Sequence, residues 1–250
     1  MRGKLHIRNW FAVGALGLSV LGFASKGSGL INPQDLPKSW QGKEHSKRFE
    51  SYRTGKKLAR LVAESKEEIV EVNMGVLPEL APISRGNLPS YPSPFLRRSA
   101  CDSDAIVLGS VNNQSSSETE NGEFVFTEVR FGVTQLLKDN AIAPIPLNSE
   151  ITVIRPGGTI QMGSRTVRAV DPFFPQFENH AQYLLFLRYV SETGAYQAYG
   201  ISSYVLKGKK VFLLTVRPAL GKRNFQAEDL SRFMDEVKEA IIASCSEMSR

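Results

Sequence analysis

The fold of this chain is decided by residues 123–137, whose sequence is EFVFTEVRFGVTQLL. Every second residue from Val125 to Val133 is apolar or β-branched, and the residues between them include Glu128 and Arg130. Because a strand points successive side chains to opposite faces, this alternation predicts a half-buried β-strand. Gly132 lies inside the run, where a glycine lets a strand bend or coil around a barrel. We therefore expect a long strand that curves.

Further segments with strand character follow along the chain, separated by turn sequences such as Pro156-Gly157-Gly158. They are residues 105–111, 151–155, 159–162, 165–170, 182–190, 195–200, 204–206 and 211–216. Residues 182–190, QYLLFLRYV, are apolar on both faces except for Arg188, so a second layer has to cover this strand. Apolar residues from Leu230 to Ile241 recur at helical spacing, and this C-terminal helix is the expected cover. A membrane-surface or partner-binding helix is the alternative.

Several motifs between residues 99 and 243 resemble an OB-type small barrel. They are Cys101 with Asp102, Asp104 and Ala105, the strand end Gly109-Ser110-Val111, the long strand running into Leu136-Leu137-Lys138, and the late strand Tyr183–Leu187. Their order resembles the netrin-module and tissue-inhibitor-of-metalloproteinases group, which implies a five-stranded barrel with a C-terminal helix. It resembles more closely a set of uncharacterised exported bacterial proteins with the same Cys-Asp start and a late Arg-Pro-Gly-Gly. Metalloproteinase inhibitors use a processed N-terminal cysteine, whereas Cys101 lies far inside this chain, so the resemblance implies the fold and not protease inhibition.

The expected fold class is therefore mainly β, a small OB-like barrel of five to seven strands with a packed C-terminal α-helix and an N-terminal helical, proline-rich extension. We divide the chain into four parts. They are a signal peptide or short anchor over residues 1–24, a basic, proline-rich stalk over 25–98 with one helix near 51–72, the barrel over 99–222, and the C-terminal helix over 223–250.

The first 24 residues have the pattern of a secretory signal. Three basic residues precede residues 10–24, an uncharged run of 15 residues that ends in Gly22-Phe23-Ala24. A spanning helix needs about 20 apolar residues, so a cleaved signal is favoured, with an uncleaved anchor or a buried helix as alternatives. We expect an exported protein that is periplasmic, on the cell surface or extracellular.

The formal net charge of +6 is concentrated near the N-terminus. Residues 38–60 contain eight Lys and Arg against two Glu, whereas residues 61–250 sum to −3. The basic segment is interpreted as a solvated spacer, with contact to anionic lipid headgroups at a membrane surface as the alternative. We expect a protein or polysaccharide of the cell envelope as the partner, and not nucleic acid.

The two cysteines, Cys101 and Cys245, lie at the start of the barrel region and just after the C-terminal helix. In an exported protein they can form a disulfide that clips the helix to the barrel. Two separate buried thiols, or a reactive Cys101, are the alternatives. A Cys–His pair would need His45, which lies in the predicted tail, or His180, which lies in a polar loop.

Asp102 and Asp104 lie two residues apart at a strand start, where they could share a proton or bind calcium. Turn-initiating aspartates at a strand start are the favoured explanation, because no third or fourth acidic ligand is near them in the sequence. With two cysteines and three histidines, the chain has few side chains of the kind that ligate a metal. The sequence also contains no nucleophile-elbow motif and no phosphate-binding loop. We expect no metal, no cofactor and no catalytic residue. A hydrolase or protease inhibitor acting through Cys101 or Asp102/Asp104 is the second hypothesis, and a purely structural envelope protein is the third.

The aromatic segment 171–177, DPFFPQF, is the remaining candidate for a contact. Its residues Phe173, Phe174 and Phe177 would bind a partner or glycan if they are exposed, or fill one end of the barrel if they are buried, which we favour. Four arginines, Arg155, Arg165, Arg168 and Arg188, could converge as an anion-binding face. The candidate ligand or partner contacts are therefore Phe173, Phe174, Phe177, Arg155 and Arg168.

Overall fold

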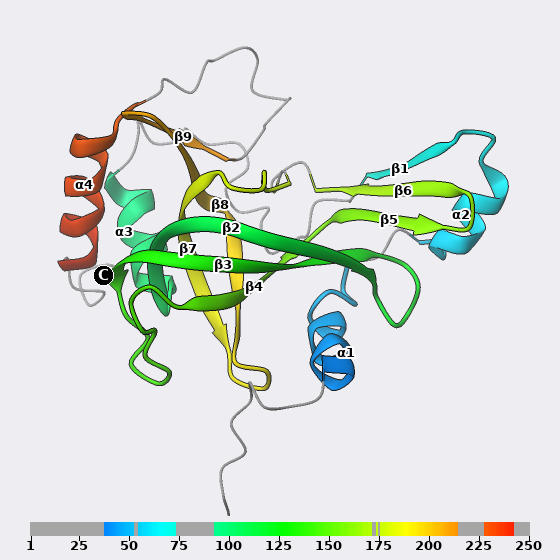
Figure 1. Cartoon of the computed structure of the whole chain (residues 1–250), viewed down its shortest axis with the longest axis horizontal. Helices are drawn as coiled ribbons and strands as arrows, with labels where there is room; N and C mark the ends of the chain where they lie inside the picture. Colours follow the sequence, from blue (N-terminus) through cyan, green and yellow to red (C-terminus); the bar gives the residue numbers. More distant parts are fainter. Residues whose placement is uncertain are drawn as a thin grey trace, which may run out of the picture. The chain divides into compact units, whose positions relative to one another are not determined.

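The computed structural model describes residues 38–52, 55–73, 93–171, 174, 176–214 and 228–242. These residues form a mainly β structure with two sheets and a C-terminal helix (Figure 1). The helices are α1 (Lys38–Arg48), α2 (Leu58–Glu64), α3 (Ser93–Asp102) and α4 (Leu230–Ile242). The strands are β1 (Ile69–Asn73), β2 (Ala105–Glu118), β3 (Val125–Lys138), β4 (Glu150–Pro156), β5 (Gly158–Met162), β6 (Arg165–Val170), β7 (Gln182–Val190), β8 (Ala195–Lys207), β9 (Lys210–Leu213) and β10 (Glu228–Asp229).

Five strands of the larger sheet are joined in a ring of hydrogen-bonded pairs. The sheet has the order β10-β9-β8-β4-β3-β2-β7, and β7 pairs in addition with β8. Within the ring β4 and β8 are parallel, whereas the other four pairs are antiparallel. Figure 1 shows β2, β3 and β4 crossing in front of β7 and β8. The smaller sheet has the order β1-β6-β5.

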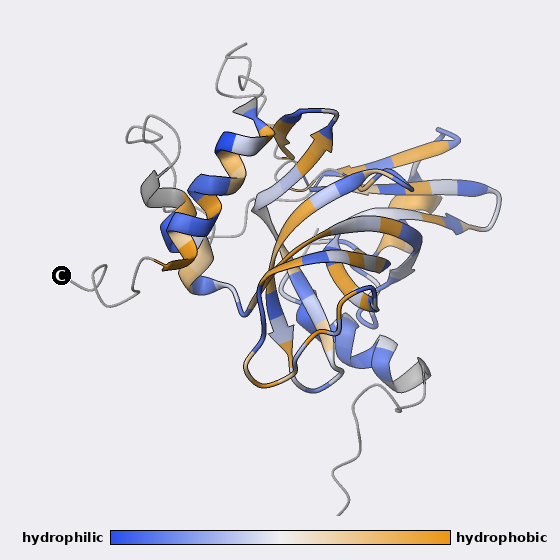
Figure 2. Cartoon of the chain, turned by 60° about the vertical axis from the view of Figure 1, so that its left-hand side comes forward, coloured by the Kyte–Doolittle hydropathy of each residue, from blue (hydrophilic) through white to orange (hydrophobic). Residues whose placement is uncertain are grey.

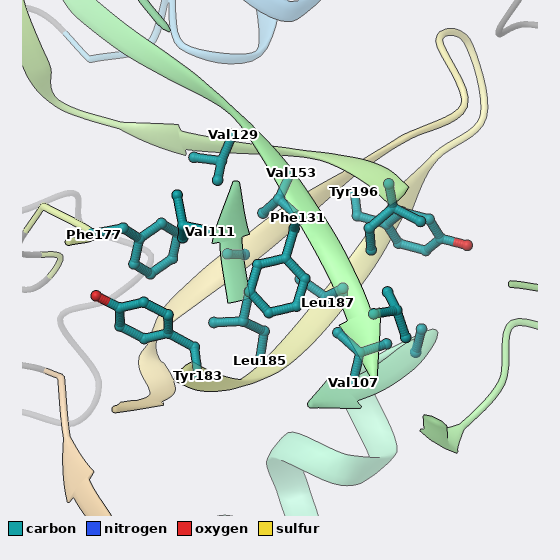
Figure 3. Packing of buried hydrophobic residues seen from close by; sticks show 14 of the residues in the cluster. Val107, Val111, Val129, Phe131, Val153, Phe177, Tyr183, Leu185, Leu187 and Tyr196 are labelled. Atoms are coloured by element: carbon teal, nitrogen blue, oxygen red, sulfur yellow. The ribbon is translucent and has the colours of Figure 1, made fainter. Parts of the chain in front are cut away.

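The apolar side chains of β3 that recur at every second residue point into the core, as the sequence predicts. Val129, Phe131 and Val133 are at most 1% exposed and pack in one cluster with side chains from β2, β4, β7 and β8 (Figure 3). Glu128 and Arg130, the residues on either side of Val129, stay accessible to solvent. The strand predicted over residues 123–137 is confirmed, with bounds of Val125–Lys138.

Two glycines let β2 and β3 approach closely as they coil around this cluster. The register between the strands shifts beside Gly109, and Ser110 pairs with Gly132. A Cβ atom on Gly109 would collide with the carbonyl oxygen of Gly132 and lie 2.7 Å from a ring carbon of Phe131. Only glycine fits at this crossing, which agrees with the curvature expected from Gly132.

The cover predicted for the doubly apolar strand is confirmed. Phe233 and Val237 of α4 are fully buried against Leu184 and Phe186 of β7. The ring of Phe233 also lies 4.7 Å from that of Tyr204 on β8. Figure 2 shows the apolar stripe of α4 turned toward the sheet. The helix therefore buries a stripe that would otherwise face solvent.

A second covering helix, α3, is missing from the sequence prediction, which treats residues 73–98 as an extended connector. This helix starts at Ser93-Pro94, a serine and proline of the kind that commonly begins a helix. Leu96 and Ala100 then bury their side chains in the same cluster as α4. The proline density of the connector obscured the helix start.

The predicted stalk is wrong for the residues described between 38 and 73, which pack on the domain. Phe49 and Leu58 are fully buried in a cluster with Phe126 of β3, and the Phe49 and Phe126 rings stack at 5.6 Å. The single helix near 51–72 is also wrong, because α2 covers only Leu58–Glu64 and β1 follows. Val70 and Val72 alternate with exposed residues along β1, a period of two that the helical interpretation overlooked.

Some expectations fall on residues outside those described. The signal or anchor over residues 1–24, the connector residues 74–92 and Cys245 belong to this group. Among the described residues, no helix combines the length and the hydropathy needed to cross a bilayer.

Adding one methyl group at Gly109 should destabilise the fold strongly. We expect Gly109→Ala to lower the free energy of unfolding by about 2 to 4 kcal/mol, because the new Cβ overlaps the backbone of β3. Gly42→Ala is the matched control, since Gly42 lies in α1 with no atom within 4 Å of the place its Cβ would take, and helices favour alanine by about 1 kcal/mol. Chemical unfolding followed by circular dichroism measures both, and equal effects would contradict the close approach.

Candidate ligand-binding cleft

A polar cleft of about 260 Å³ lies on the outer face of the ring, beside α1. The alternation that sends Val129 and Phe131 inward sends Glu128 and Arg130 outward, into this cleft. Neighbouring strands contribute residues in register, since Asn113 pairs with Arg130 and Arg130 with Thr152. The cleft is lined by Gln41, Asn113, Gln114, Ser115, Glu128, Arg130 and Thr152.

Arg130 is the one cation in this lining, and carboxylates surround it. Its Nη1 donates a hydrogen bond to the Thr152 hydroxyl at 3.3 Å and lies 3.9 Å from a carboxylate oxygen of Glu150. Glu128 faces the same cleft two residues earlier on β3. The charges nearly balance, so the cleft suits a neutral polar ligand better than a polyanion.

A buried histidine, His45, contacts the Glu128 carboxylate and fixes its orientation. Nδ1 of His45, on α1, lies 2.6 Å from a carboxylate oxygen of Glu128, and its Nε2 lies 2.9 Å from the Thr193 hydroxyl. A hydroxyl, an imidazole and a carboxylate in this order also form the triad of serine hydrolases. Here His45 is 2% exposed and Thr193 3% exposed, so a substrate has no access to the hydroxyl. The arrangement docks α1 and holds the Glu128 side chain.

Among the described residues, five of the eight cations in the basic segment 38–60 pair with carboxylates. Lys47 pairs with Glu44, and Arg48 with Glu192 in the turn between β7 and β8. The remaining pairs in this segment are Lys43–Glu120, Lys56–Glu64 and Arg60–Glu64. These pairs are solvent-exposed and weak individually, and they offset only part of the positive charge of the segment.

Arg155 is buried in the interior, where its charge is held by carbonyls and aromatic rings. It is 1% exposed, and its Nη2 donates a hydrogen bond to the Phe174 carbonyl oxygen at 2.7 Å. The guanidinium carbon lies 4.8 Å from the ring centroid of Phe174 and 5.5 Å from that of Phe177. Burial lowers the pKa of Arg155 to about 9, and the negative charge of Asp171 opposes this shift. The guanidinium stays charged at neutral pH.

The aromatic segment fills the interior, the arrangement that the sequence favours. Phe174 is 3% exposed and Phe177 2% exposed, and the Phe177 ring lies 4.8 Å from that of Tyr183. The prediction that Phe174 and Phe177 contact a ligand or partner is therefore wrong, because no ligand can reach these buried side chains. Phe173 lies outside the described residues.

The four arginines do not form one anion-binding face. Arg155 is in the interior, whereas Arg168 is exposed on β6 and Arg188 is exposed on β7. Arg165, also on β6, donates to the backbone carbonyl of Val62. Contact of Arg155 with a ligand is excluded by its burial, and Arg168 lies apart from the cleft lining.

The side chains around the end of α3 have structural contacts. Asp102 lies 3.6 Å from the Arg98 guanidinium, and Asp104 accepts a hydrogen bond from the Tyr189 backbone N–H at 2.7 Å. The Lys138 ammonium donates to the carbonyls of Ala100 and Ser103 at the same point, and desolvation lowers its pKa. Within the described ranges, no three His, Cys, Asp or Glu side chains gather as a possible metal site.

Sequence reasoning missed the cleft and His45. The hydrogen bonds of His45 span 83 and 148 residues along the chain, to Glu128 and Thr193. The alternation around Glu128 and Arg130 was the available signal, because it marks both as outward-facing on a half-buried strand.

Removing the buried guanidinium should cost far more stability than removing an exposed one. We expect Arg155→Ala to lower the free energy of unfolding by about 3 kcal/mol or more, because it empties a packed site and leaves the Phe174 carbonyl unpaired. Arg168→Ala, the same change at an exposed position, should stay within about 0.5 kcal/mol. Urea unfolding measures the free energy of unfolding of both variants. Similar losses for the two would contradict the burial of Arg155.

Cys101 is partly buried in the last turn of α3, and Cys245 lies outside the described residues, so their disulfide stays a prediction. We expect no thiol to react with a labelling reagent in the native chain until it is reduced. Cys101→Ser, Cys245→Ser and the double variant should lose the same stability, about 5 kcal/mol in the chain-entropy model. Two thiols that titrate without reduction would exclude the bond.

No protein-family model matches this chain, and no curated protein matches it in sequence.

Proposed function

We propose that this protein is an exported, non-catalytic binding domain of the cell envelope, and that it takes a polysaccharide in the cleft between α1 and strands β2, β3 and β4. The mixed lining of the cleft carries this proposal. Amides, hydroxyls, one carboxylate and one guanidinium lie together there. Sugar hydroxyls both donate and accept hydrogen bonds, so such a lining can satisfy them on several sides.

The fold supports a binding role. The ring β2-β3-β4-β8-β7, with α4 packed on it, agrees with an OB-type barrel, the architecture that the sequence resemblance implies. OB folds bind oligosaccharides and oligonucleotides on one face of the barrel and its adjoining loops. The cleft lies on the outer face of three ring strands, so its position suits this use of the fold.

The charge of the cleft favours a sugar over a nucleic acid. Arg130 is flanked by Glu128 and Glu150, whereas proteins that bind nucleic acids line the groove with unopposed cations. The segment from residue 61 onward also has a negative sum of charges. A neutral or weakly charged polysaccharide avoids the repulsion that a phosphate backbone would meet.

No contact in the described residues favours the hydrolase or inhibitor hypothesis. Asp102 is engaged by Arg98, and Asp104 by the backbone of Tyr189, and neither aspartate belongs to the cleft lining. The imidazole nearest the cleft, His45, is itself buried. Export is supported by the basic residues and the uncharged run at residues 10–24.

Replacing the cleft arginine should weaken binding without unfolding the protein. The test is isothermal titration with soluble peptidoglycan fragments and neutral glucan oligosaccharides, with single-stranded DNA for comparison. We expect Arg130→Ala to raise the Kd for the bound sugar about tenfold, because a charged hydrogen-bond donor is lost. Arg168→Ala removes an exposed arginine outside the cleft and should change the Kd less than about twofold.

Two outcomes would contradict the proposal. One is that none of the sugars binds, and the other is that binding is unaffected by Arg130→Ala and by Gln114→Ala. Tight binding of DNA that weakens steeply with salt would favour the nucleic-acid class instead.

A further inference from the structure

The loop between β3 and β4 carries two highly exposed aliphatic side chains. Its sequence over residues 139–149 is DNAIAPIPLNS, which contains no charge after Asp139. Ile142 is 83% exposed and Leu147 is 61% exposed. The cleft does not include this loop, so its exposed side chains need a separate explanation.

Hydrogen bonds to the backbone hold the first half of the loop. The Asp139 carboxylate accepts from the N–H of Ile145 at 2.9 Å, and the Asn140 side-chain oxygen accepts from the N–H of Ile142 at 3.0 Å. Ile142 is therefore presented to solvent by an ordered backbone.

The loop is also fastened to the body of the fold. The Tyr196 hydroxyl on β8 accepts a hydrogen bond from the Asn140 amide at 3.2 Å and donates one to the Ala143 carbonyl at 3.1 Å. Ile145 turns inward, is 5% exposed and joins the interior cluster. Because the loop is already ordered, its exposed side chains can enter another apolar phase at little cost in conformational entropy.

We infer that this loop inserts Ile142 and Leu147 into the outer layer of a lipid bilayer and so sets the orientation of the protein at a membrane. This goes beyond the proposed function, because it involves neither the cleft nor its ligand.

The small size of the apolar tip favours a bilayer over a protein partner. A stable protein interface buries about 800 Å² on each partner, and two exposed aliphatic side chains provide much less. A bilayer needs no complementary pocket, and each aliphatic side chain that leaves water contributes by itself.

The position of the loop is the second argument. Tyr196, which fastens the loop, lies just after the β7–β8 turn, and Glu192 of that turn pairs with Arg48 of α1. Figure 1 shows the loop, this turn and α1 together at the lower end of the view. The chain enters α1 from residues 1–37, which include the uncharged run 10–24. If residues 1–24 are retained as an anchor, the alternative to the cleaved signal, the anchor precedes α1 in the chain, and two weak membrane contacts together make a stable one.

The absence of charge on the loop predicts how binding depends on the lipid. The loop has no cation, and Lys43, Lys47 and Arg48 of α1 are paired with carboxylates. Insertion of the loop itself, as distinct from partition of the whole chain, should therefore be equally deep in vesicles of phosphatidylcholine alone and in vesicles that also contain phosphatidylglycerol.

The first measurement is the partition of the full-length chain onto these vesicles by flotation. Ile142→Asp/Leu147→Asp should lower the partition coefficient about tenfold, because two apolar contacts are replaced by charges. Ile69→Asp/Ile242→Asp is the matched control, since these are the other two large aliphatic side chains that are exposed in the described part of the chain. It should leave partition unchanged.

The second measurement reports on the loop itself, even if residues 10–24 alone keep the chain on the vesicle. Ile142→Trp is made in a chain with Trp10→Phe and Trp40→Phe, so that all tryptophan emission comes from position 142. We expect a blue shift on vesicles and quenching by lipids brominated on the acyl chains.

Quenching at position 142 supports the proposal, and the flotation result then measures how much the loop adds. Emission that stays unquenched overturns the proposal, however strongly the whole chain partitions onto the vesicles. If the Ile142→Asp/Leu147→Asp variant then also loses self-association in sedimentation, the loop belongs to an interface with a second copy.

Discussion

Strand β7 is hydrogen-bonded along both of its edges, to β2 and to β8, and the arrangement of the domain depends on this double pairing. Its side chains alternate between two apolar clusters. Tyr183, Leu185 and Leu187 lie in one cluster with side chains of β2, β3, β4 and β8, and Leu184 and Phe186 lie in another with side chains of α3 and α4. One strand therefore couples the interior of the ring to the helical cover, so neither can form its full core without the other.

The parts of this fold that the sequence predicts are those with a short repeat. The period of two between Val125 and Val133 and the apolar stripe from Leu230 to Ile241 each locate an element, because packing on one side imposes that spacing. Residues 182–190 further indicate a cover, since a strand that is apolar on both faces cannot remain half-exposed.

The parts that escaped prediction depend on partners that are distant in the sequence. Val70 and Val72 belong to β1 because β6 pairs with them, and this pairing crosses nearly a hundred residues. His45 reaches Glu128 and Thr193 over comparable distances. The burial of Arg155 was not predicted for a related reason. A charged residue at a strand end is usually exposed, and the burial of this one depends on the carbonyls of Pro156 and Phe174 and on the rings of Phe174 and Phe177. The propensity of a short segment for helix or strand depends on its own residues, so it cannot predict contacts with such distant partners.

The parallel pairing of β1 with β6 has a consequence for what happens when the chain is cut. The strand lies in the N-terminal part of the chain, whereas its partner, together with β5, forms a hairpin that comes after β4. Proteolytic trimming that removed β1 would leave the amide and carbonyl groups along one side of β6 without their neighbour, and would uncover Val167 and Ala169. A bare edge of this kind recruits strands from other molecules. As long as β1 stays attached, β1 itself forms this edge of the sheet, and Val167 and Ala169 stay covered.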